Sequence, residues 1–179
     1  VTDADTMRQA AAFDHVCAAY KQNYRSVDNF LKADCLPMDC DNDHSDDTDE
    51  WITPEKLSEM LTDVAFAVTY SRHHMLAKGS VSARPRFHVF FPTTPCKDAT
   101  FHKAIKARIY KELPFFDGNA LDASRFLFGS KGEVIWHEGS LTIEDWLTLM
   151  KSNRSIPEGQ RNSTLSRIAG RLVKRFGVT

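Results

Sequence analysis

A short acidic motif directly after an apolar segment constrains this chain more than any other feature. Residues 30–38 are mostly apolar and include Pro37, which argues against a helix, and they lead into Asp39-Cys40-Asp41. On a β-strand, side chains alternate between the two faces, so Asp39 and Asp41 point the same way, with Cα atoms about 6.6 Å apart. Paired carboxylates of this kind can hold divalent metal ions, as in enzymes that act on phosphates.

Composition narrows the class of protein. The chain has 179 residues, 42% hydrophobic and 26% charged, which predicts one soluble globular domain of ordinary composition. No apolar run is long enough to cross a membrane, and the polar N-terminus has no secretory pattern. We therefore expect a cytoplasmic protein with no membrane partner.

The four cysteines argue against a zinc ribbon, because no two of them form a CxxC pair. Cys35, Cys40 and His44 could be combined as metal ligands. Reduced cysteines near a strand are the favoured interpretation.

Charge is strongly segregated although the net charge is only −1. Residues 39–50 contain seven acids and no Lys or Arg, whereas residues 64–111 contain nine basic residues and one acid. Residues 151–179 add seven basic residues against Glu158. An acidic patch flanked by basic stretches suits a polyphosphate or nucleic-acid substrate. Ordinary solvated charge remains the alternative.

Helix and strand patterns intermix along the chain. Apolar spacing predicts helices over 7–24, from Thr53, over 99–113, from Thr142 and over 165–176. Strands are predicted over 30–38, 65–70, 86–91, 121–128 and 133–136. The strands over 65–70 and 86–91 would form a hairpin with a long basic connection. This mixture predicts an α/β (α+β) fold.

Two further groups of residues could carry chemistry. Arg86 and His88 share one face of their predicted strand, where a basic residue beside a histidine suits a phosphate chain. Asp122 lies within an apolar segment, with Arg125 three residues later. A carboxylate in such surroundings needs a partner or a metal, and an Asp122–Arg125 pair at a turn is an equal alternative.

A calcium loop is disfavoured. Asp39, Asp41, Asp43 and Glu50 match acidic positions of the EF-hand pattern, but His44 occupies the position that requires glycine. The preceding segment, with Pro37, is not helical either.

In this order and spacing, the three motifs resemble those of the archaeo-eukaryotic primase superfamily. Met38-Asp39-Cys40-Asp41 is similar to its first motif, Arg86-Phe87-His88 to its second and Leu121-Asp122 to its third. The hairpin region from Tyr70-Ser71-Arg72 to His88 looks like the nucleotide-binding hairpin of bacterial, phage and mobile-element primase-polymerases. Residues 156–165 resemble the start of the small helical domain that follows in such primases.

The resemblance implies a catalytic domain over 1–150 and the beginning of a truncated helical C-terminal domain over 151–179. The catalytic domain would combine an RNA-recognition-motif-like sheet with an N-terminal α/β unit. The implied activity is template-directed nucleotidyl transfer, as a DNA primase or DNA polymerase, in replication of a phage, plasmid or mobile element. The implied partners are a single-stranded DNA template, NTPs or dNTPs, and a helicase domain or protein.

Residue roles follow from the same resemblance. Two Mg²⁺ or Mn²⁺ ions would be held by Asp39, Asp41 and Asp122, with Asp117 as an alternative third acid because it also follows an apolar pair. The residues expected to contact the nucleotide are His88, Arg86, Ser71, Arg72, Lys78 and Arg125. The expected contacts to the nucleic-acid backbone are Lys103, Lys106, Arg161 and Arg167.

Two other classes of function remain open. A metal-dependent nuclease could use the same acids, with less need for Arg86 and His88. A non-catalytic module that binds single-stranded DNA would not need the acids. Replication-initiator nucleases with a His-hydrophobic-His motif are disfavoured, because His73 and His74 are adjacent and no His pair flanks Val89.

Overall fold

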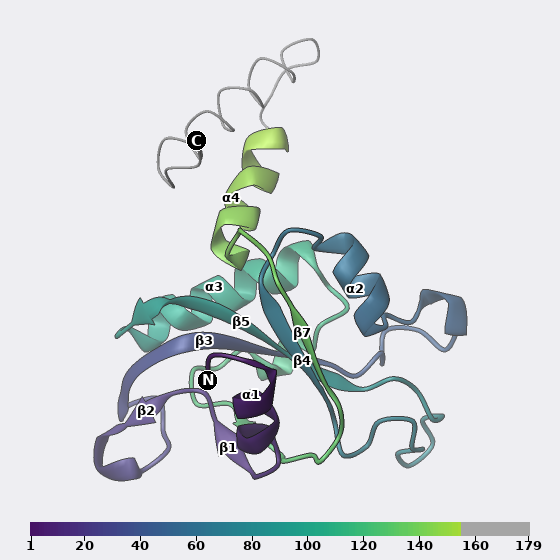
Figure 1. Cartoon of the computed structure of the whole chain (residues 1–179), viewed down its shortest axis with the longest axis horizontal. Coiled ribbons are helices and arrows are strands. Elements are labelled where there is room, and N and C mark those ends of the chain that lie inside the picture. The colour runs from purple at the N-terminus through teal and green to yellow at the C-terminus, as the bar shows by residue number, and fades with distance from the viewer. Residues whose placement is uncertain (155–179) are drawn as a thin grey trace.

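A five-stranded antiparallel sheet forms the centre of the computed structural model, which describes residues 1–154 (Figure 1). Its spatial order is β2-β3-β5-β4-β7. The bounds are β2 Ala19–Tyr20, β3 Phe30–Cys40, β5 Phe87–Cys96, β4 Phe66–Tyr70 and β7 Val134–His137. Helices pack on the sheet, so the predicted α+β class is confirmed.

The ladder between β3 and β5 is the longest in the sheet and fixes its register. Met38 pairs with Val89, Asp39 with His88, and Cys40 with Phe87. Strand β4 continues the same rows on the other side of β5, where Thr69 pairs with His88. Residues that pair across strands share a face of the sheet, so Asp39, His88 and Thr69 form one row.

Pro37 lies inside β3, where proline is normally excluded because it lacks an N–H. The Asp39 carbonyl points away from β5 and accepts a bond from the Asp117 N–H at 2.8 Å. Residues two apart in a strand point their backbone groups to the same side, so the ring nitrogen of Pro37 faces this edge too. Strand β2 pairs with β3 only near residues 30–32, so no ladder bond is lost at Pro37.

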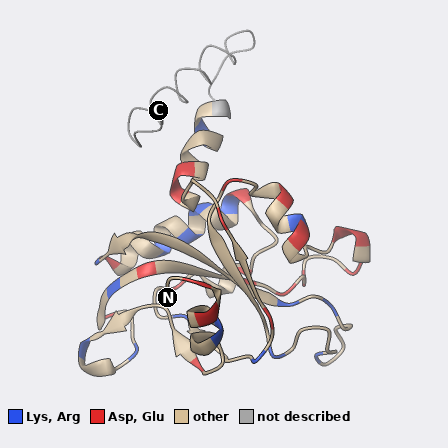
Figure 2. Ribbon diagram, viewed as in Figure 1, with Lys and Arg blue, Asp and Glu red and all other residues tan. Residues whose placement is uncertain are grey.

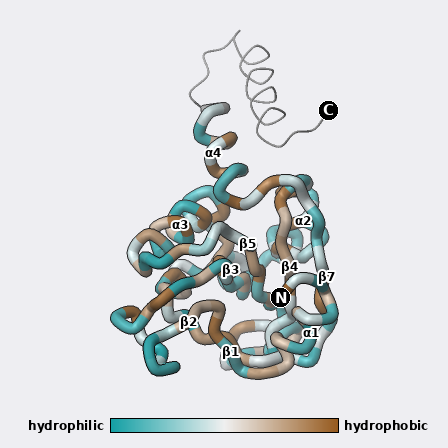
Figure 3. The backbone as a smooth tube through the Cα atoms, turned by 60° about the vertical axis from the view of Figure 1, so that its left-hand side comes forward, coloured by the Kyte–Doolittle hydropathy of each residue, from teal (hydrophilic) through white to brown (hydrophobic). Residues whose placement is uncertain are grey.

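One face of the sheet carries the main hydrophobic core. Helices α2 (Pro54–Met60), α3 (Ala99–Glu112) and α4 (Ile143–Arg154) cover this face (Figure 1). The strands themselves are strongly apolar (Figure 3). Their alternate side chains enter the core, including Leu36, Met38, Val68, Phe87, Val89 and Phe91.

The opposite face carries a smaller apolar cluster beside the Asp39 row. Helix α1 (Ala4–Ala11) packs near β4 and β7, and β1 (His15–Val16) pairs with β6 (Phe126–Leu127) in a separate two-stranded sheet. Met7, Phe90 and Leu127 belong to this cluster. The β1–β6 pair brings the segment around Arg125 over the face that holds Asp39.

The acidic loop after β3 is closed by buried polar side chains. Asn42 adopts a positive φ of 54°, and its amide bonds both the N–H and the carbonyl of Ile52 and the carbonyl of Pro85. Arg84 donates to the carbonyls of Asn42 and Ser45 and to the carboxylate of Asp46. The loop includes the 3₁₀ helix η2 (Thr48–Glu50), whose acids are visible in Figure 2.

Two sequence predictions of secondary structure are wrong. The helix expected over 7–24 ends at Ala11, because the following residues instead pair in β1 and β2, with the short 3₁₀ helix η1 (Lys21–Asn23) after them. The strand expected over 121–128 is reduced to β6, because Asp122 forms a side-chain turn with Ser124. A 3₁₀ helix, η3 (Gly118–Ala120), precedes it.

The helix expected over 165–176 lies outside the described residues, so the division into 1–150 and 151–179 stays a prediction. Helix α4 itself runs to Arg154. Within residues 1–154, no helix is long and apolar enough to cross a membrane.

Gly139, in the loop after β7, allows a close backbone approach. A Cβ at this position would lie 2.5 Å from the Asp63 carbonyl oxygen and 2.6 Å from the Ala65 nitrogen. We expect Gly139→Ala to lower the free energy of unfolding by about 1–3 kcal/mol, because the backbone must shift. Urea denaturation measures this effect. The control is Gly132→Ala, whose Cβ would meet nothing nearer than 3.5 Å; equal effects of the two changes would contradict the prediction.

Candidate active site

Asp39 and His88 face one another across β3 and β5. The Asp39 side chain is almost fully buried, with 5% of the residue exposed. Its Oδ2 accepts a short hydrogen bond in an ion pair with the Arg125 guanidinium. Its Oδ1 is buried with no hydrogen-bond partner among the described residues. A buried carboxylate oxygen without a partner is costly, so Oδ1 is the atom of this site that most needs a cation or a donor.

Asp41 continues the acidic face two residues further along the chain, just past the end of β3, and is half-buried. Burial raises the pKa of its carboxyl, and the negative charges of Asp39 and Asp43 raise it further. The charges of Lys78 and Arg86 oppose this rise. A cation between Asp39 and Asp41 would relieve the same repulsion.

Asp122 lies on a connection that runs along the free edge of β3. The Asp117 N–H donates to the Asp39 carbonyl, and Lys106 donates from Nζ to the carbonyl of Ala120 at 2.6 Å and more weakly to that of Asp122 at 3.4 Å. Burial alone would raise the pKa of Asp122, but hydrogen bonds from Ser124 and the charges of Lys106 and Arg125 outweigh it and lower the pKa. The Asp122 carboxylate is therefore ionised and near the site.

The site fits a metal ion only in part. The charges of Asp39 and Asp41 interact, and Asp39 Oδ1 has no hydrogen-bond partner among the described residues. Among residues 1–154, however, no three His, Cys, Asp or Glu side chains converge on a point that could hold a metal. Asp122 Oδ1 bonds Ser124, and Asp117 caps η3 by accepting from the Asn119 N–H. The choice between Asp122 and Asp117 as third ligand therefore stays open.

His88 lies between Asp39 and Thr69 in the row of paired residues. Burial lowers its pKa, while the charge of Asp39 opposes the shift. The imidazole is therefore neutral at neutral pH, and no residue within 1–154 hydrogen-bonds its ring. A neutral ring can donate from one nitrogen and accept at the other.

Arg86 directly precedes β5, and its side chain is buried. Only 1% of the residue is exposed, and Nη1 donates to the carbonyls of His73 and Leu76. Nε and Nη2 have no hydrogen-bond partner among the described residues, although Nη2 lies 3.8 Å from the Asp43 carboxylate. Arg86 thus supports the loop after β4 and keeps two donors unused.

The other residues expected to bind nucleotide are spread around the site. Arg125 pairs with Asp39, and Lys78 is close enough to Asp41 to influence its pKa. Ser71 Oγ accepts from the His73 N–H. Arg72 instead pairs with Asp14 at 2.8 Å and lies over the ring of Phe128, so it is engaged away from the Asp39–His88 row.

The expected nucleic-acid contact by Lys106 is wrong. Basic residues do lie along α3 (Figure 2), and Lys103 is exposed. Lys106, by contrast, is fully buried, because Nζ bonds backbone carbonyls beneath the site and lies near the carboxylates of Asp39 and Asp122. Arg161 and Arg167 lie outside the described residues.

Comparisons with known proteins give one structural similarity. No protein-family model matches the sequence, and no curated protein matches it. The fold is similar to the AEP domain of the cyanophage S-2L primase-polymerase (PrimPol), with 14% sequence identity and a TM-score of 0.47. The match covers 72% of this chain and 63% of that one. The chain thus spans less than two thirds of that domain.

Among the residues that shape the site, sequence reasoning assigned the wrong role to Lys106 and missed Thr69 and Asn42. Lysines are normally exposed, so nothing in the sequence indicated a buried Lys106. Its burial is explained by its bonds to the backbone carbonyls of Ala120 and Asp122. Thr69 gave no signal beyond its place in a strand. Asn42 directly follows the acidic motif, and asparagine tolerates a positive φ, so its role in turning the chain could have been anticipated.

Burial lowers the pKa of Lys106 from 10.5 to about 8, although Asp39 and Asp122 act to raise it. The unfolded chain therefore binds more protons than the folded one between these two pH values, and stability from this group rises with pH there. Below pH 8 both states are protonated, so its contribution is constant and least favourable.

We accordingly expect wild type to gain stability relative to Lys106→Met, by at most about 3 kcal/mol, as pH rises from about 8 to 10.5. Urea denaturation of both proteins in the presence of a chelator measures this difference. A difference that does not change with pH would contradict the assignment.

Proposed function

We propose that this protein is a template-directed nucleotidyltransferase of the primase-polymerase type, acting on a single-stranded DNA template with NTPs or dNTPs. The observation that carries the proposal is the cross-strand pair of Asp39 and His88. Two motifs separated by almost fifty residues, each similar to a motif of that family, meet on one face of the sheet. Asp41 and the connection that carries Asp122 adjoin them.

Asp39 and Asp41 would hold Mg²⁺ or Mn²⁺, with Asp122 or Asp117 contributing once its turn contact is released. Two such ions would supply activation of a 3′-hydroxyl and stabilisation of the leaving pyrophosphate. The free Oδ1 of Asp39 and the raised pKa of Asp41 support this role.

The basic and neutral donors of the site suit a triphosphate. His88 offers a ring N–H that no described residue uses, and Arg86, directly before the same strand, has two donor nitrogens without hydrogen bonds among the described residues. Charge-assisted bonds from arginine to phosphate are among the strongest in proteins. Lys78 and Arg125 add positive charge beside the acids. This set of donors favours a polymerase over a nuclease, because a nuclease does not need to bind a triphosphate.

Contacts outside the site belong to the same proposal. Lys103 on α3, with Arg161 and Arg167, would bind the DNA backbone through salt-dependent contacts. Residues 151–179 would begin a helical domain that leads towards a helicase domain or protein. These parts would serve replication of a phage, plasmid or mobile element.

Single changes of the acids test the proposal. We expect Asp39→Ala, Asp41→Ala and Asp122→Ala each to lower nucleotide incorporation by at least about a thousandfold, since each removes several kcal/mol of charge stabilisation. Primer extension and primer synthesis on single-stranded DNA, with NTPs or dNTPs and with Mg²⁺ or Mn²⁺, measure this loss. Asp28→Ala removes an exposed acid outside the three motifs; it is the matched control and should keep full activity.

The outcomes separate the residue assignments from the function. Full activity of Asp122→Ala, with loss in Asp117→Ala, would transfer the third position to Asp117. Circular dichroism and thermal melting of each variant exclude simple unfolding. Degradation of labelled DNA by the wild type with metal and without nucleotides would favour the nuclease instead. DNA binding that survives Asp39→Ala, with no incorporation by the wild type, would favour the non-catalytic module.

A further inference from the structure

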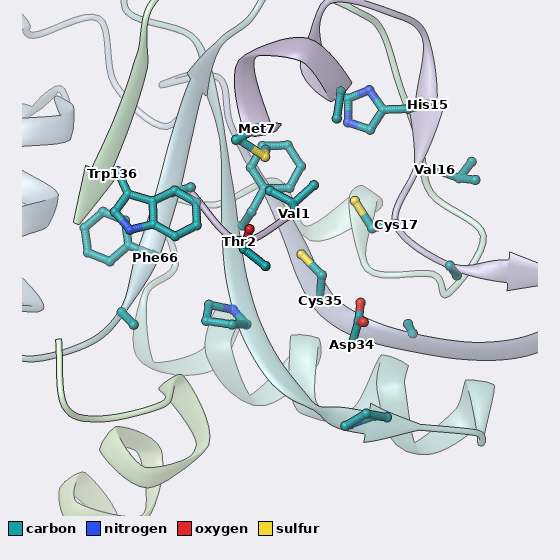
Figure 4. Close-up of a pocket in the computed structure, with 18 of the residues that line it drawn as sticks. Val1, Thr2, Met7, His15, Val16, Cys17, Asp34, Cys35, Phe66 and Trp136 are labelled. Carbon is teal, nitrogen blue, oxygen red and sulfur yellow. The ribbon is translucent and has the colours of Figure 1, made fainter. Parts of the chain in front are cut away.

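Two cysteines from different parts of the chain meet on the sheet face that carries Asp39. Cys17 lies just before β2, and Cys35 lies in β3. Because β2 pairs antiparallel with β3, with Ala19 opposite Lys32, the chain before β2 runs alongside the later residues of β3. Both side chains point into the same cavity (Figure 4), and the two thiols are close enough to shift each other's pKa.

The cavity gives these thiols access from outside. It has a volume of about 930 Å³ and is lined mainly by apolar side chains, among them Met7, Phe66, Phe90 and Trp136. His15, on β1, also lines it (Figure 4). Both cysteines are free and partly exposed. A small uncharged oxidant can therefore reach the sulfur atoms without unfolding of the chain.

The surroundings make the two thiols chemically unequal. The contact with Cys35 lowers the pKa of Cys17 to about 6; burial opposes this shift, while a hydrogen bond and charge from His15 reinforce it. The same contact and burial raise the pKa of Cys35. The two pKa values thus shift in opposite directions, which favours ionisation of the Cys17 thiol over that of Cys35. A thiolate beside a second thiol is the arrangement found at redox-sensitive cysteines.

We propose that Cys17 and Cys35 form a redox site that closes into a reversible disulfide on reaction with a hydroperoxide. The Cys17 thiolate attacks one peroxide oxygen, breaking the O–O bond and giving a sulfenic acid; with hydrogen peroxide, hydroxide leaves and takes up a proton to become water. The Cys35 sulfur then attacks the Cys17 sulfur and loses its proton, and the sulfenic oxygen leaves as water. In total, two thiols are oxidised, and one hydrogen peroxide is reduced to two waters.

The bond would tie the segment before β2 to the strand that carries the acidic motif. Cys35 precedes Asp39 by four residues, and its carbonyl accepts from the buried ring of His102. Cys17 also lines a small pocket together with Pro37, Asp122 and Arg125. The site therefore adjoins the candidate active site, but its chemistry does not depend on the proposed function.

Titration of the native, reduced protein with hydrogen peroxide tests the proposal. We expect the wild type to lose two free thiols and the mass of two hydrogen atoms, and to regain both with dithiothreitol. Peptide mapping after alkylation should give one cross-link, between Cys17 and Cys35. The oxidised protein should melt at a higher temperature than the reduced one, because the cross-link restricts the unfolded chain.

Cysteine variants complete the test. Cys17→Ser should slow peroxide consumption by about tenfold or more, since the reactive thiolate is lost. Cys35→Ser should still react but stop at a sulfenic acid, which a dimedone probe traps. Cys96→Ser, at the end of β5, is the matched control and should behave as wild type. A cross-link through Cys40 or Cys96 would overturn the proposal. So would equal peroxide reactivity of Cys17→Ser and wild type, or irreversible oxidation of wild type with no cross-link.

Discussion

The register of the β3–β5 ladder is the constraint on which the rest of this structure depends. It places Met38 beside Val89 in the core and Asp39 beside His88 on the opposite face. Because side chains alternate along a strand, a slip of one residue would exchange these faces. Core and site are thus specified by the same pairing, since placing Asp39 and His88 in the apolar core instead of Met38 and Val89 would be strongly unfavourable. The alternation between apolar and polar residues in both strands therefore fixes the geometry of the site.

A second layer of contacts holds the later part of the chain against this ladder. Arg125 pairs with Asp39, the Asp117 N–H bonds the Asp39 carbonyl, and Lys106 bonds the carbonyls of Ala120 and Asp122. The connection has little regular structure of its own, so these polar contacts must hold its position. Removing one partner of a buried charge pair leaves the other uncompensated and is strongly destabilising. The candidate site is therefore also a structural element, and variants of Asp39 need a folding control.

The sequence was most informative where a residue pattern had one physical solution. The residue patterns over 30–38 and 86–91 predicted two strands, which the structure has as β3 and β5. The prediction failed over 7–24, where an approximate apolar stripe was interpreted as one helix. The apolar residues of that segment in fact serve α1, β1 and β2. Around Asp122 the apolar neighbours suggested a strand, but the bond of its own carboxylate to Ser124 competes with extended pairing.

Side-chain burial was the part that the sequence could not supply. Arg86 and Lys106 carry long charged side chains, which are rarely buried unless they are paired. Their partners are mostly backbone carbonyls of segments distant in sequence or on the far side of a loop, such as Leu76 for Arg86 and Ala120 for Lys106. No pattern in the sequence indicates that a side chain will bond to a backbone carbonyl of a distant segment. This explains why both residues were assigned to ligand binding, although both also support the loops that surround the site.

The charges of the side chains around Asp39 are almost balanced, and this balance limits how the site could work. Four carboxylates and four basic groups interact there: Asp39, Asp41, Asp43 and Asp122 with Lys78, Arg86, Lys106 and Arg125. Since Arg125 occupies Asp39 Oδ2, the residue offers only Oδ1 to a cation. Adding a cation alone would leave excess positive charge in a poorly solvated place. A cation that arrives with an anionic phosphate chain avoids this, because the phosphate charge offsets that of the cation. For the proposed function, the electrostatics therefore favour joint binding of metal and nucleotide over binding of metal first.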